Sequence, residues 1–309
     1  MIICAGEALI DMLPRRSADG ESCFAPIPGG AVFNTAIALG RLGVPVGLAT
    51  GISTDLMGQR LIEALETSHV DHTPAHRSDR PTTLAFVELS NGQASYAFYD
   101  EGTAGRMLSP DDLPADLGDA EALFIGGISL VSEPCASAYE ALATREAGNR
   151  VLMIDPNIRP GFITDSDAYR ARIDRLIGLA DIVKLSDEDL RWLYGAEAPL
   201  DTLARQILDM GPKLFCLTEG ADGVTGYTAA GAFRVAAEKA EVVDTVGAGD
   251  TFNAGLLAGL FRAGKLDKDG IAALDEAALR DAIGLGVRAA AVTVARAGAN
   301  PPTASDLGL

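Results

Sequence analysis

Cysteine, histidine and tryptophan are scarce in this sequence, with four, three and one among 309 residues. The four cysteines are scattered and form no CxxC pair, so the sequence predicts neither a disulfide framework nor a zinc site, but reduced, buried thiols. No apolar run approaches the roughly 20 residues that a membrane-spanning helix needs, and the first residues lack the basic region of a signal peptide. We therefore expect a cytoplasmic protein with no membrane partner.

Basic residues are also few, because 25 lysines and arginines stand against 43 aspartates and glutamates, a formal net charge of −18. Such a charge repels nucleic acid, so no nucleic-acid partner is expected, and an anionic substrate would need a local positive site. The hydrophobic content of 48% is enough for a large core. It favours a single folded domain over residues 1–309.

What the sequence does contain is an alternation of short apolar runs with helical stretches. This alternation predicts βαβ units, and hence a three-layer α/β fold with a mostly parallel central sheet covered on both faces. The expected strands are 1–5, 44–49, 122–125, 150–154, 180–185 and 213–218. The expected helices are 33–42, 54–67, 135–147, 167–180, 186–194, 201–210, 249–263 and 279–294.

One region interrupts this alternation. Residues 82–89 and 93–99 are rich in β-forming residues and are separated by Asn91-Gly92, a dipeptide that favours a tight hairpin turn. Together with the polar stretch 15–28, this hairpin could form a small antiparallel flap. A solvent-exposed hairpin without a function is the alternative.

The most informative segment runs from Asp244 through Gly247-Ala248-Gly249 to Asp250. Its small residues let backbone amides converge at a helix start, where unpaired N–H groups and the helix dipole attract anions. Asp250 follows in the first helical turn, where it could take a proton or merely complement the dipole. The dipole is expected to lower its pKa.

This segment, Asp244-Thr-x-Gly-Ala-Gly-Asp250-x-Phe252, resembles the C-terminal signature of the ribokinase-like, or PfkB, carbohydrate kinases. The run Gly29-Gly30-Ala-Val-Phe-Asn34 resembles a second signature of that family, and the resemblance extends from Gly6 to about Gly298. It implies a small β lid at about residues 12–28 and 82–106, and Mg2+-ATP as phosphoryl donor. It further implies Asp250 as general base, an anion hole at Gly247, Ala248 and Gly249, and a sugar site that includes Gly29, Gly30 and Asn34.

Other positions carry roles only through this resemblance. Asp11 matches an acidic residue that binds two sugar hydroxyls, although an aspartate at a strand end can also simply cap a turn. Asn157 and Arg159 match a segment that faces the substrate or the phosphates, and Arg159 could instead form a surface salt bridge. Phe98 lies in a stretch that resembles bacterial fructokinases, and it is assigned to the sugar site.

The nucleotide and metal sites are the least defined. The run Lys184-Leu-Ser186-Asp-Glu-Asp189 takes the place of the family's Asn-x-x-Glu motif, with serine for asparagine and aspartate for glutamate, so Asp189 is expected to hold Mg2+ only through water. The turn with Thr218, Gly220 and Gly223 resembles the nucleotide-binding turn, or is a plain β-turn. A monovalent cation such as K+ is implied near the backbone of Asp244, Val246, Thr293 and Gly298.

The resemblance favours D-fructose, phosphorylated at its 6-hydroxyl. A 2-keto-3-deoxygluconate kinase is the first alternative, with Arg106 binding the substrate carboxylate. A non-catalytic sugar or nucleotide sensor is the second, since a fold alone does not establish a function. A homodimer through the lid is a further expectation, with Phe24, Tyr96 or Phe98 in the interface.

Overall fold

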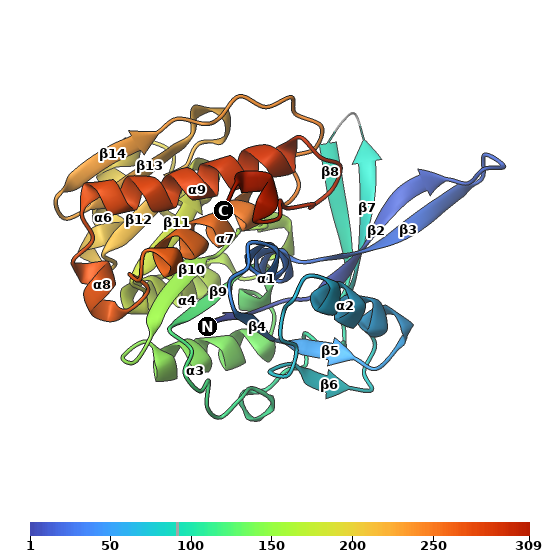
Figure 1. Cartoon of the computed structure of the whole chain (residues 1–309). Helices are drawn as coiled ribbons and strands as arrows, with labels where there is room; N and C mark the ends of the chain where they lie inside the picture. Colours follow the sequence, from blue (N-terminus) through green and yellow to red (C-terminus); the bar gives the residue numbers. More distant parts are fainter. Residues whose placement is uncertain (91–92) are drawn as a thin grey trace.

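The computed structural model describes residues 1–90 and 93–309, and the side chains of residues 88–90 and 93–96 are not described. An eight-stranded sheet forms its centre (Figure 1), in the order β14-β13-β12-β11-β10-β9-β1-β4. The strands from β12 to β4 in this order run parallel, and β13 and β14 are antiparallel. The predicted mostly parallel sheet is therefore confirmed. The bounds are β1 Ile2–Ala5, β4 Val46–Ala49, β9 Ala122–Gly126, β10 Val151–Asp155, β11 Ile182–Ser186, β12 Leu214–Thr218, β13 Val224–Thr228 and β14 Gly231–Val235.

Helices cover both faces of this sheet. In strand β1, Ile2 and Cys4 point into one hydrophobic core and Ile3 and Ala5 into the other, because successive side chains of a strand face opposite sides. The first core is closed by α1 (Ala31–Arg41), α2 (Leu56–Thr67), α7 (Ala248–Arg262), α8 (Lys268–Ala272) and α9 (Glu276–Val294). The second is closed by α3 (Cys135–Glu146), α4 (Ser166–Leu179), α5 (Asp187–Tyr194) and α6 (Leu200–Asp209). The three-layer prediction is confirmed.

A second sheet of four strands, in the order β3-β2-β7-β8, projects from the core (Figure 1). It contains β2 (Leu9–Arg16), β3 (Ser22–Gly29), β7 (Leu84–Ser90) and β8 (Gln93–Tyr99). Residues 12–28 and the two predicted strands at 82–99 all fall in or between these strands. The predicted turn at Asn91-Gly92 lies outside the described residues.

Short elements were missed. Helix α8 has five residues, and the strands β5 (Gly51–Ser53) and β6 (His76–Ser78) have three each, which is too short for a period to be read in a sequence. The antiparallel strands β13 and β14 were also missed. In β14 only Phe233 is buried, so this strand forms no apolar run. Single 3-10 turns are η1 (Pro110–Asp112), η2 (Ile128–Leu130), η3 (Pro160–Phe162), η4 (Gly220–Asp222) and η5 (Ser305–Leu307).

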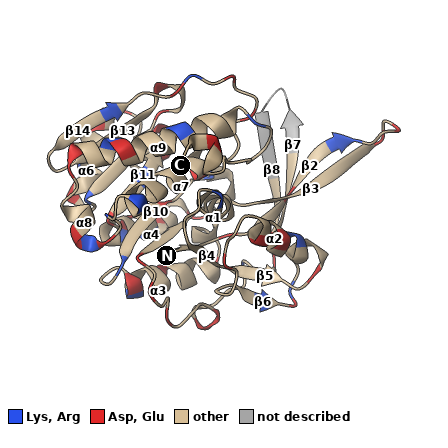
Figure 2. Ribbon diagram, viewed as in Figure 1, with Lys and Arg blue, Asp and Glu red and all other residues tan. Residues whose placement is uncertain are grey.

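The structure bears on the expectations about charge, membrane spans and the cysteines. Acidic and basic residues are interleaved on helices α8 and α9 (Figure 2). Within the described part of the chain, no helix combines the length and hydropathy that crossing a bilayer requires. All four cysteines are free, and three are buried, but Cys23 is exposed on β3. The prediction of four buried thiols was therefore wrong at Cys23, because β3 belongs to the projecting sheet and not to the core.

Candidate active site

The sequence motifs meet at the carboxyl-terminal edge of the central sheet. Asp155 ends β10, Ser186 ends β11 and Thr218 ends β12, so these three neighbouring strands deliver their last side chains to one edge. In open α/β sheets this edge is where ligands bind. Helix α7, which begins at Ala248, and helix α1, which begins at Ala31, pack against each other at the same place.

A glycine turn precedes α7. Gly247 has φ 78°, and a Cβ at this position would lie 2.7 Å from Cβ of Ala299, so both conformation and space require glycine here. The carboxylate of Asp244 fixes the turn, because Oδ1 accepts from the N–H of Val246 at 3.0 Å and Oδ2 from the N–H of Gly298 at 2.9 Å. No side chain caps the start of α7. The N–H of Ala248 donates to the carbonyl oxygen of Thr245 at 3.3 Å, and a helix start of this kind is where an anion can be attracted.

Asp250 lies in the first turn of α7 and is 7% exposed. Its Oδ2 accepts a hydrogen bond of 2.9 Å from Nδ2 of Asn34, on helix α1. Burial raises the pKa of Asp250 to about 7, and the Asp155 carboxylate adds to the rise, while the Asn34 hydrogen bond and the charge of Lys184 oppose it. The prediction that the helix dipole lowers this pKa was therefore wrong, since desolvation of the carboxylate dominates.

Lys184 and Asp155 form a buried ion pair beside the glycine turn. Nζ of Lys184 donates to Oδ2 of Asp155 at 3.0 Å, and Nδ2 of Asn253 donates to the same oxygen at 2.7 Å. A Cβ at Gly249 would lie 3.2 Å from Nζ of Lys184, so the ammonium group touches the turn. Nearby carboxylates raise the pKa of Lys184 despite its burial, which keeps it charged. This cation supplies local positive charge in an acidic chain.

Sequence reasoning missed Asp155 and Asn253 as parts of this site. A signal was present for each: Asp155 is an acidic residue directly after a buried apolar strand, and Asn253 stands three residues after Asp250, on the same face of a helix. Their pairing with Lys184 could not be predicted, because the three residues are brought together only by the sheet and by α7.

Three of the predicted sugar residues, Asp11, Gly29 and Phe98, belong to the projecting sheet. Asp11, Ala85 and Phe98 are register partners across β2, β7 and β8, so their side chains share a face. A Cβ at Gly29 would lie 2.3 Å from Oδ2 of Asp11, which explains glycine there. Burial raises the pKa of Asp11 to about 6. The ring of Phe98 packs against Phe162 of the core at 4.7 Å between centroids.

The segment after β10 curves back over this edge. Asn157 has φ 47°, and its N–H donates to Oδ1 of Asp155 at 3.1 Å. Arg159 is exposed, and its Nη1 donates to the carbonyl oxygen of Ile158 at 3.0 Å. Among the described residues Arg159 forms no ion pair. Its charge lowers the pKa of Asp250, so it lies within electrostatic reach of that group.

The side chains of Ser186 and Asp189 both accept hydrogen bonds from backbone N–H groups. Oγ of Ser186 caps helix α5 by accepting from the N–H of Asp189 at 3.0 Å, and Oδ1 of Asp189 accepts from the N–H of Ile158 at 3.2 Å. No cluster of three or more histidine, cysteine or acidic side chains that could hold a metal ion is found within residues 1–90 and 93–309. The oxygen atoms of Ser186 and Asp189 are donors that suit a hard ion such as Mg2+, which keeps several waters and binds substrate phosphates.

The remaining predicted residues occupy two loops. Gly220 and Gly223, with φ 54° and 99°, flank the turn after Thr218. A Cβ at Gly223 would lie 2.3 Å from the carbonyl oxygen of Val235, so this turn is packed against β14. Near the glycine turn, Asp244 joins the loop of Val246 to that of Gly298, and Oγ1 of the buried Thr293 donates to Oγ1 of Thr251 at 3.0 Å.

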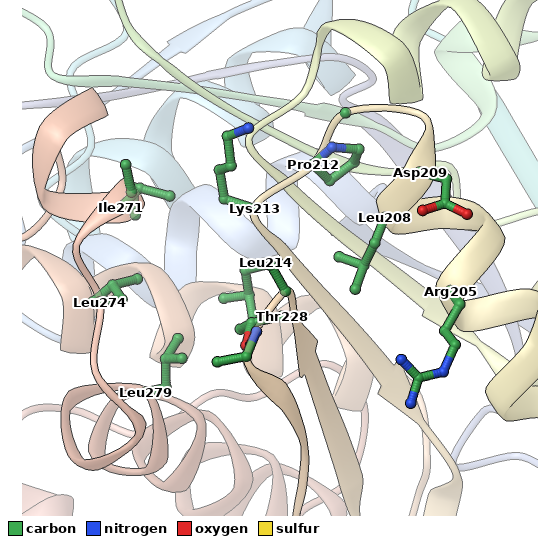
Figure 3. A pocket seen from close by; sticks show the side chains of 14 residues that line it. Arg205, Leu208, Asp209, Pro212, Lys213, Leu214, Thr228, Ile271, Leu274 and Leu279 are labelled. Carbon is green, nitrogen blue, oxygen red and sulfur yellow. The ribbon is translucent and has the colours of Figure 1, made fainter.

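A cavity of about 620 Å3 lies elsewhere (Figure 3). It is lined by Leu214, the first residue of β12, and by Thr228, Lys213 and Leu279 among others. Since the active-site residues end their strands, this cavity opens at the opposite edge of the sheet. None of the candidate active-site residues lines this cavity.

Comparison with known proteins agrees with this geometry. Residues 1–306 match the model of the pfkB family carbohydrate kinases. A fructokinase from Rhizobium leguminosarum bv. trifolii is 57% identical over 282 residues, covering 91% of this chain and 86% of the relative.

Two solved structures share the fold. Aminoimidazole riboside kinase from Salmonella enterica, complexed with aminoimidazole riboside and an ATP analogue, has a TM-score of 0.86 and 27% identity, covering 99% of this chain and 98% of that one. A double-mutant fructokinase from Vibrio cholerae O395, in a form with bound fructose, ADP and potassium ion, has a TM-score of 0.84 and 25% identity, covering 96% and 93%. The chain belongs to the pfkB family of carbohydrate kinases.

Proposed function

We propose that this protein is an ATP-dependent fructokinase that phosphorylates the 6-hydroxyl of D-fructose. The observation that carries the proposal is the buried carboxylate of Asp250, held by Asn34 beside an uncapped helix start and the Lys184 ammonium. Phosphoryl transfer requires a base for the attacking hydroxyl and fixed positive groups around the transferred phosphoryl group. The 57% identity to a fructokinase supports fructose as the acceptor.

The mechanism follows from these positions. Asp250 accepts the proton of the sugar hydroxyl as its oxygen attacks the γ-phosphorus, and a pKa of about 7 lets it do so near neutral pH. The N–H groups of Gly247, Ala248 and Gly249 and the charge of Lys184 stabilise the negative charge that spreads over the phosphoryl oxygens. ADP leaves with the bridging oxygen.

The other site residues orient the two substrates. Asp11, Gly29, Gly30, Asn34 and Phe98 bind fructose. Asn157 and Arg159 approach the phosphates, and Thr218, Gly220 and Gly223 accommodate the nucleotide. Mg2+ would be held by the substrate phosphates and, through water, by Ser186 and Asp189, and it would neutralise phosphate charge. A K+ ion would be held by the backbone around Asp244, Val246, Thr293 and Gly298.

The two alternatives are less well supported. Arg106, the candidate for binding the carboxylate of 2-keto-3-deoxygluconate, donates from Nη1 to Oδ1 of Asp100 at 3.0 Å, so a substrate carboxylate would have to compete with Asp100 for this side chain. A sensor would have no use for a buried base beside an anion site, where the charged form of Asp250 is costly. Both observations favour the fructokinase.

The proposal is tested by ADP release with Mg2+-ATP and a panel of fructose, 2-keto-3-deoxygluconate, ribose, glucose, adenosine and aminoimidazole riboside. The expected result is the highest kcat/KM with fructose, and fructose 6-phosphate as product, identified by a coupled isomerase assay. A higher kcat/KM with 2-keto-3-deoxygluconate would show that this acid, and not fructose, is the preferred substrate. ATP binding without turnover of any of the six would favour the sensor.

The pH dependence of catalysis follows from the raised pKa of Asp250. Below that value the carboxyl is protonated and cannot act as base, so kcat/KM for fructose should rise about tenfold per pH unit between about pH 6 and 7 and then level off. Below about pH 6 the rise should be steeper, because Asp11 of the sugar site is then protonated as well. Initial rates between about pH 5.5 and 9 at saturating ATP measure this limb. A profile that is flat down to about pH 5 would contradict the assigned base.

We further propose that the four-stranded sheet, with residues 12–28 and 82–106, is a lid, and that two copies of the chain pair through its outer face. Phe24, Phe86 and Tyr99 form an edge-to-face row there, with centroids 5.0 and 5.3 Å apart. Phe24 and Tyr99 remain 48% and 63% exposed. Phe98 faces Phe162 instead, and the side chain of Tyr96 lies outside the described part.

The double substitution Phe24→Ser and Tyr99→Ser should convert a dimer into a monomer, since exposed aromatic residues at the centre of an interface dominate its affinity. Light scattering after size exclusion measures the mass of each variant. Leu56→Ser is the matched control, because Leu56 is 74% exposed but lies at the start of α2, outside the row. A wild-type chain that is monomeric at micromolar concentration would refute the pairing.

A further inference from the structure

Helix α1 begins without a capping side chain of its own. Its N-cap residue is Gly30, and its first turn contains no acidic residue. Four N–H groups at a helix start need partners, and the positive end of the dipole favours a nearby anion. For α1 the anion and hydrogen-bond acceptors come from Glu7, a residue remote in the sequence. Glu7 lies between β1 of the core and β2 of the projecting sheet.

Glu7 is buried, and its carboxylate joins two segments. Oε1 accepts from the N–H of Ala31 at 2.8 Å, and Oε2 accepts from the N–H of Ser129, in η2, at 3.3 Å. Its carbonyl oxygen accepts from the N–H of Phe33 at 3.3 Å. Burial raises the pKa of Glu7, while the N–H groups of Ala31 and Ser129 oppose the rise.

Two glycines are shaped around this carboxylate. A Cβ at Gly30, where φ is 109°, would lie 2.9 Å from the carbonyl oxygen of Glu7. A Cβ at Gly127, where φ is 70°, would lie 2.1 Å from Oε1 of Glu7. Glycine is thus required at position 30 for the contact with Glu7, in addition to the role proposed for Gly30 in the sugar site.

We propose that Glu7 is a positioning residue that fixes the start of α1, and through it aligns the sugar site with the catalytic base. The connection is short. Gly30 touches Glu7, the N–H of Asn34 donates to the carbonyl oxygen of Gly30 at 2.8 Å, and the side chain of Asn34 holds Asp250. This inference rests on the proposed kinase function.

Two variants test it. Glu7→Gln keeps the shape but replaces one acceptor by an NH2 group, which cannot accept from both N–H groups. Ala31→Pro leaves Glu7 intact and removes the donor, at the first position of a helix, where proline is well tolerated. We expect kcat/KM for fructose to fall by about 10–100-fold in both, because small misplacements of reacting groups are costly, and KM for ATP to change by less than about twofold.

The pH profile separates positioning from mere stability. If Asn34 is no longer held, its hydrogen bond to Asp250 weakens, while Asp155, Lys184 and Arg159 still act on that carboxyl, so the acid limb should move to higher pH. Glu146→Gln is the matched control, because Glu146 is 6% exposed and pairs with Arg145 and Arg150 away from the site. It should lower the melting temperature without moving KM or the limb.

The outcomes are distinct. An active wild type whose two variants keep the wild-type kcat/KM and pH limb would overturn the role of Glu7. The role would also be overturned if the two variants lost kcat/KM equally for fructose and for ATP, and if Glu146→Gln showed the same losses at the same melting temperature. A wild type inactive on every sugar of the panel would instead count against the kinase function itself. If Glu7→Gln does not fold, Ala31→Pro carries the test alone.

Discussion

Replacing Asp250 by asparagine is expected to lower kcat for fructose by about 10²–10⁴-fold, the contribution of a positioned general base. Asparagine has nearly the same shape and can still accept the hydrogen bond from Nδ2 of Asn34, so sugar and ATP should bind with little change. It cannot accept the hydroxyl proton. Single-turnover rates and equilibrium binding of both substrates measure the two effects separately.

The same substitution should not lower stability. The pKa of Asp250 rises from 3.8 to about 7 on folding, so the folded state binds more protons than the unfolded state in this window, and stability is lost as pH rises through it. At pH 8 the buried charge therefore destabilises the wild type, and the Asp250→Asn variant should melt at the same or a higher temperature. Asp181→Asn, remote from the site, is the control, which should have a lower melting temperature than the wild type but keep its activity. Turnover above about one tenth of wild type in Asp250→Asn would exclude the assigned base.

The periodicity of the sequence predicted the six parallel strands of the central sheet and eight of the helices, because long amphipathic helices and buried parallel strands carry strong patterns. It missed α8, which has only five residues, and the antiparallel strands β13 and β14, of which β14 is mostly exposed and forms no apolar run. The glycine turn and Asp250 were found because a local backbone conformation demands particular residues. The rise in the pKa of Asp250 was not predicted, because the burial of this carboxylate against α1 is a tertiary property.

The same division applies to the rest of the site. Glu7 and Asp155 stood inside motifs whose other members were assigned, yet neither received a role. Each owes its function to a partner more than twenty residues away in sequence: Ala31 and Ser129 for Glu7, and Lys184 and Asn253 for Asp155. A sequence motif locates such carboxylates, and only the packing of the elements shows what they hold.

The buried pair of Lys184 and Asp155 leads to the second large effect. Replacing Lys184 alone would leave the Asp155 carboxylate buried without a counter-charge, which costs about 3–5 kcal/mol and could unfold the chain. The double substitution Lys184→Gln with Asp155→Asn avoids this, because two neutral amides can still hydrogen-bond to each other and to Asn253. It removes the cation that touches Gly249 while keeping the volume of the site.

We expect this double variant to remain folded and to lose about 10²–10³-fold in kcat, the usual effect of removing one group that stabilises charge in a transition state. Its matched control is Lys268→Gln with Asp181→Asn, which neutralises another lysine–aspartate pair, 2.6 Å apart, between α8 and the residue just before β11. That control should keep near-wild-type turnover. If both double variants turn over fructose within about threefold of wild type, Lys184 has no part in stabilising the transferred phosphoryl group, and the anion site rests on the backbone amides and bound Mg2+ alone.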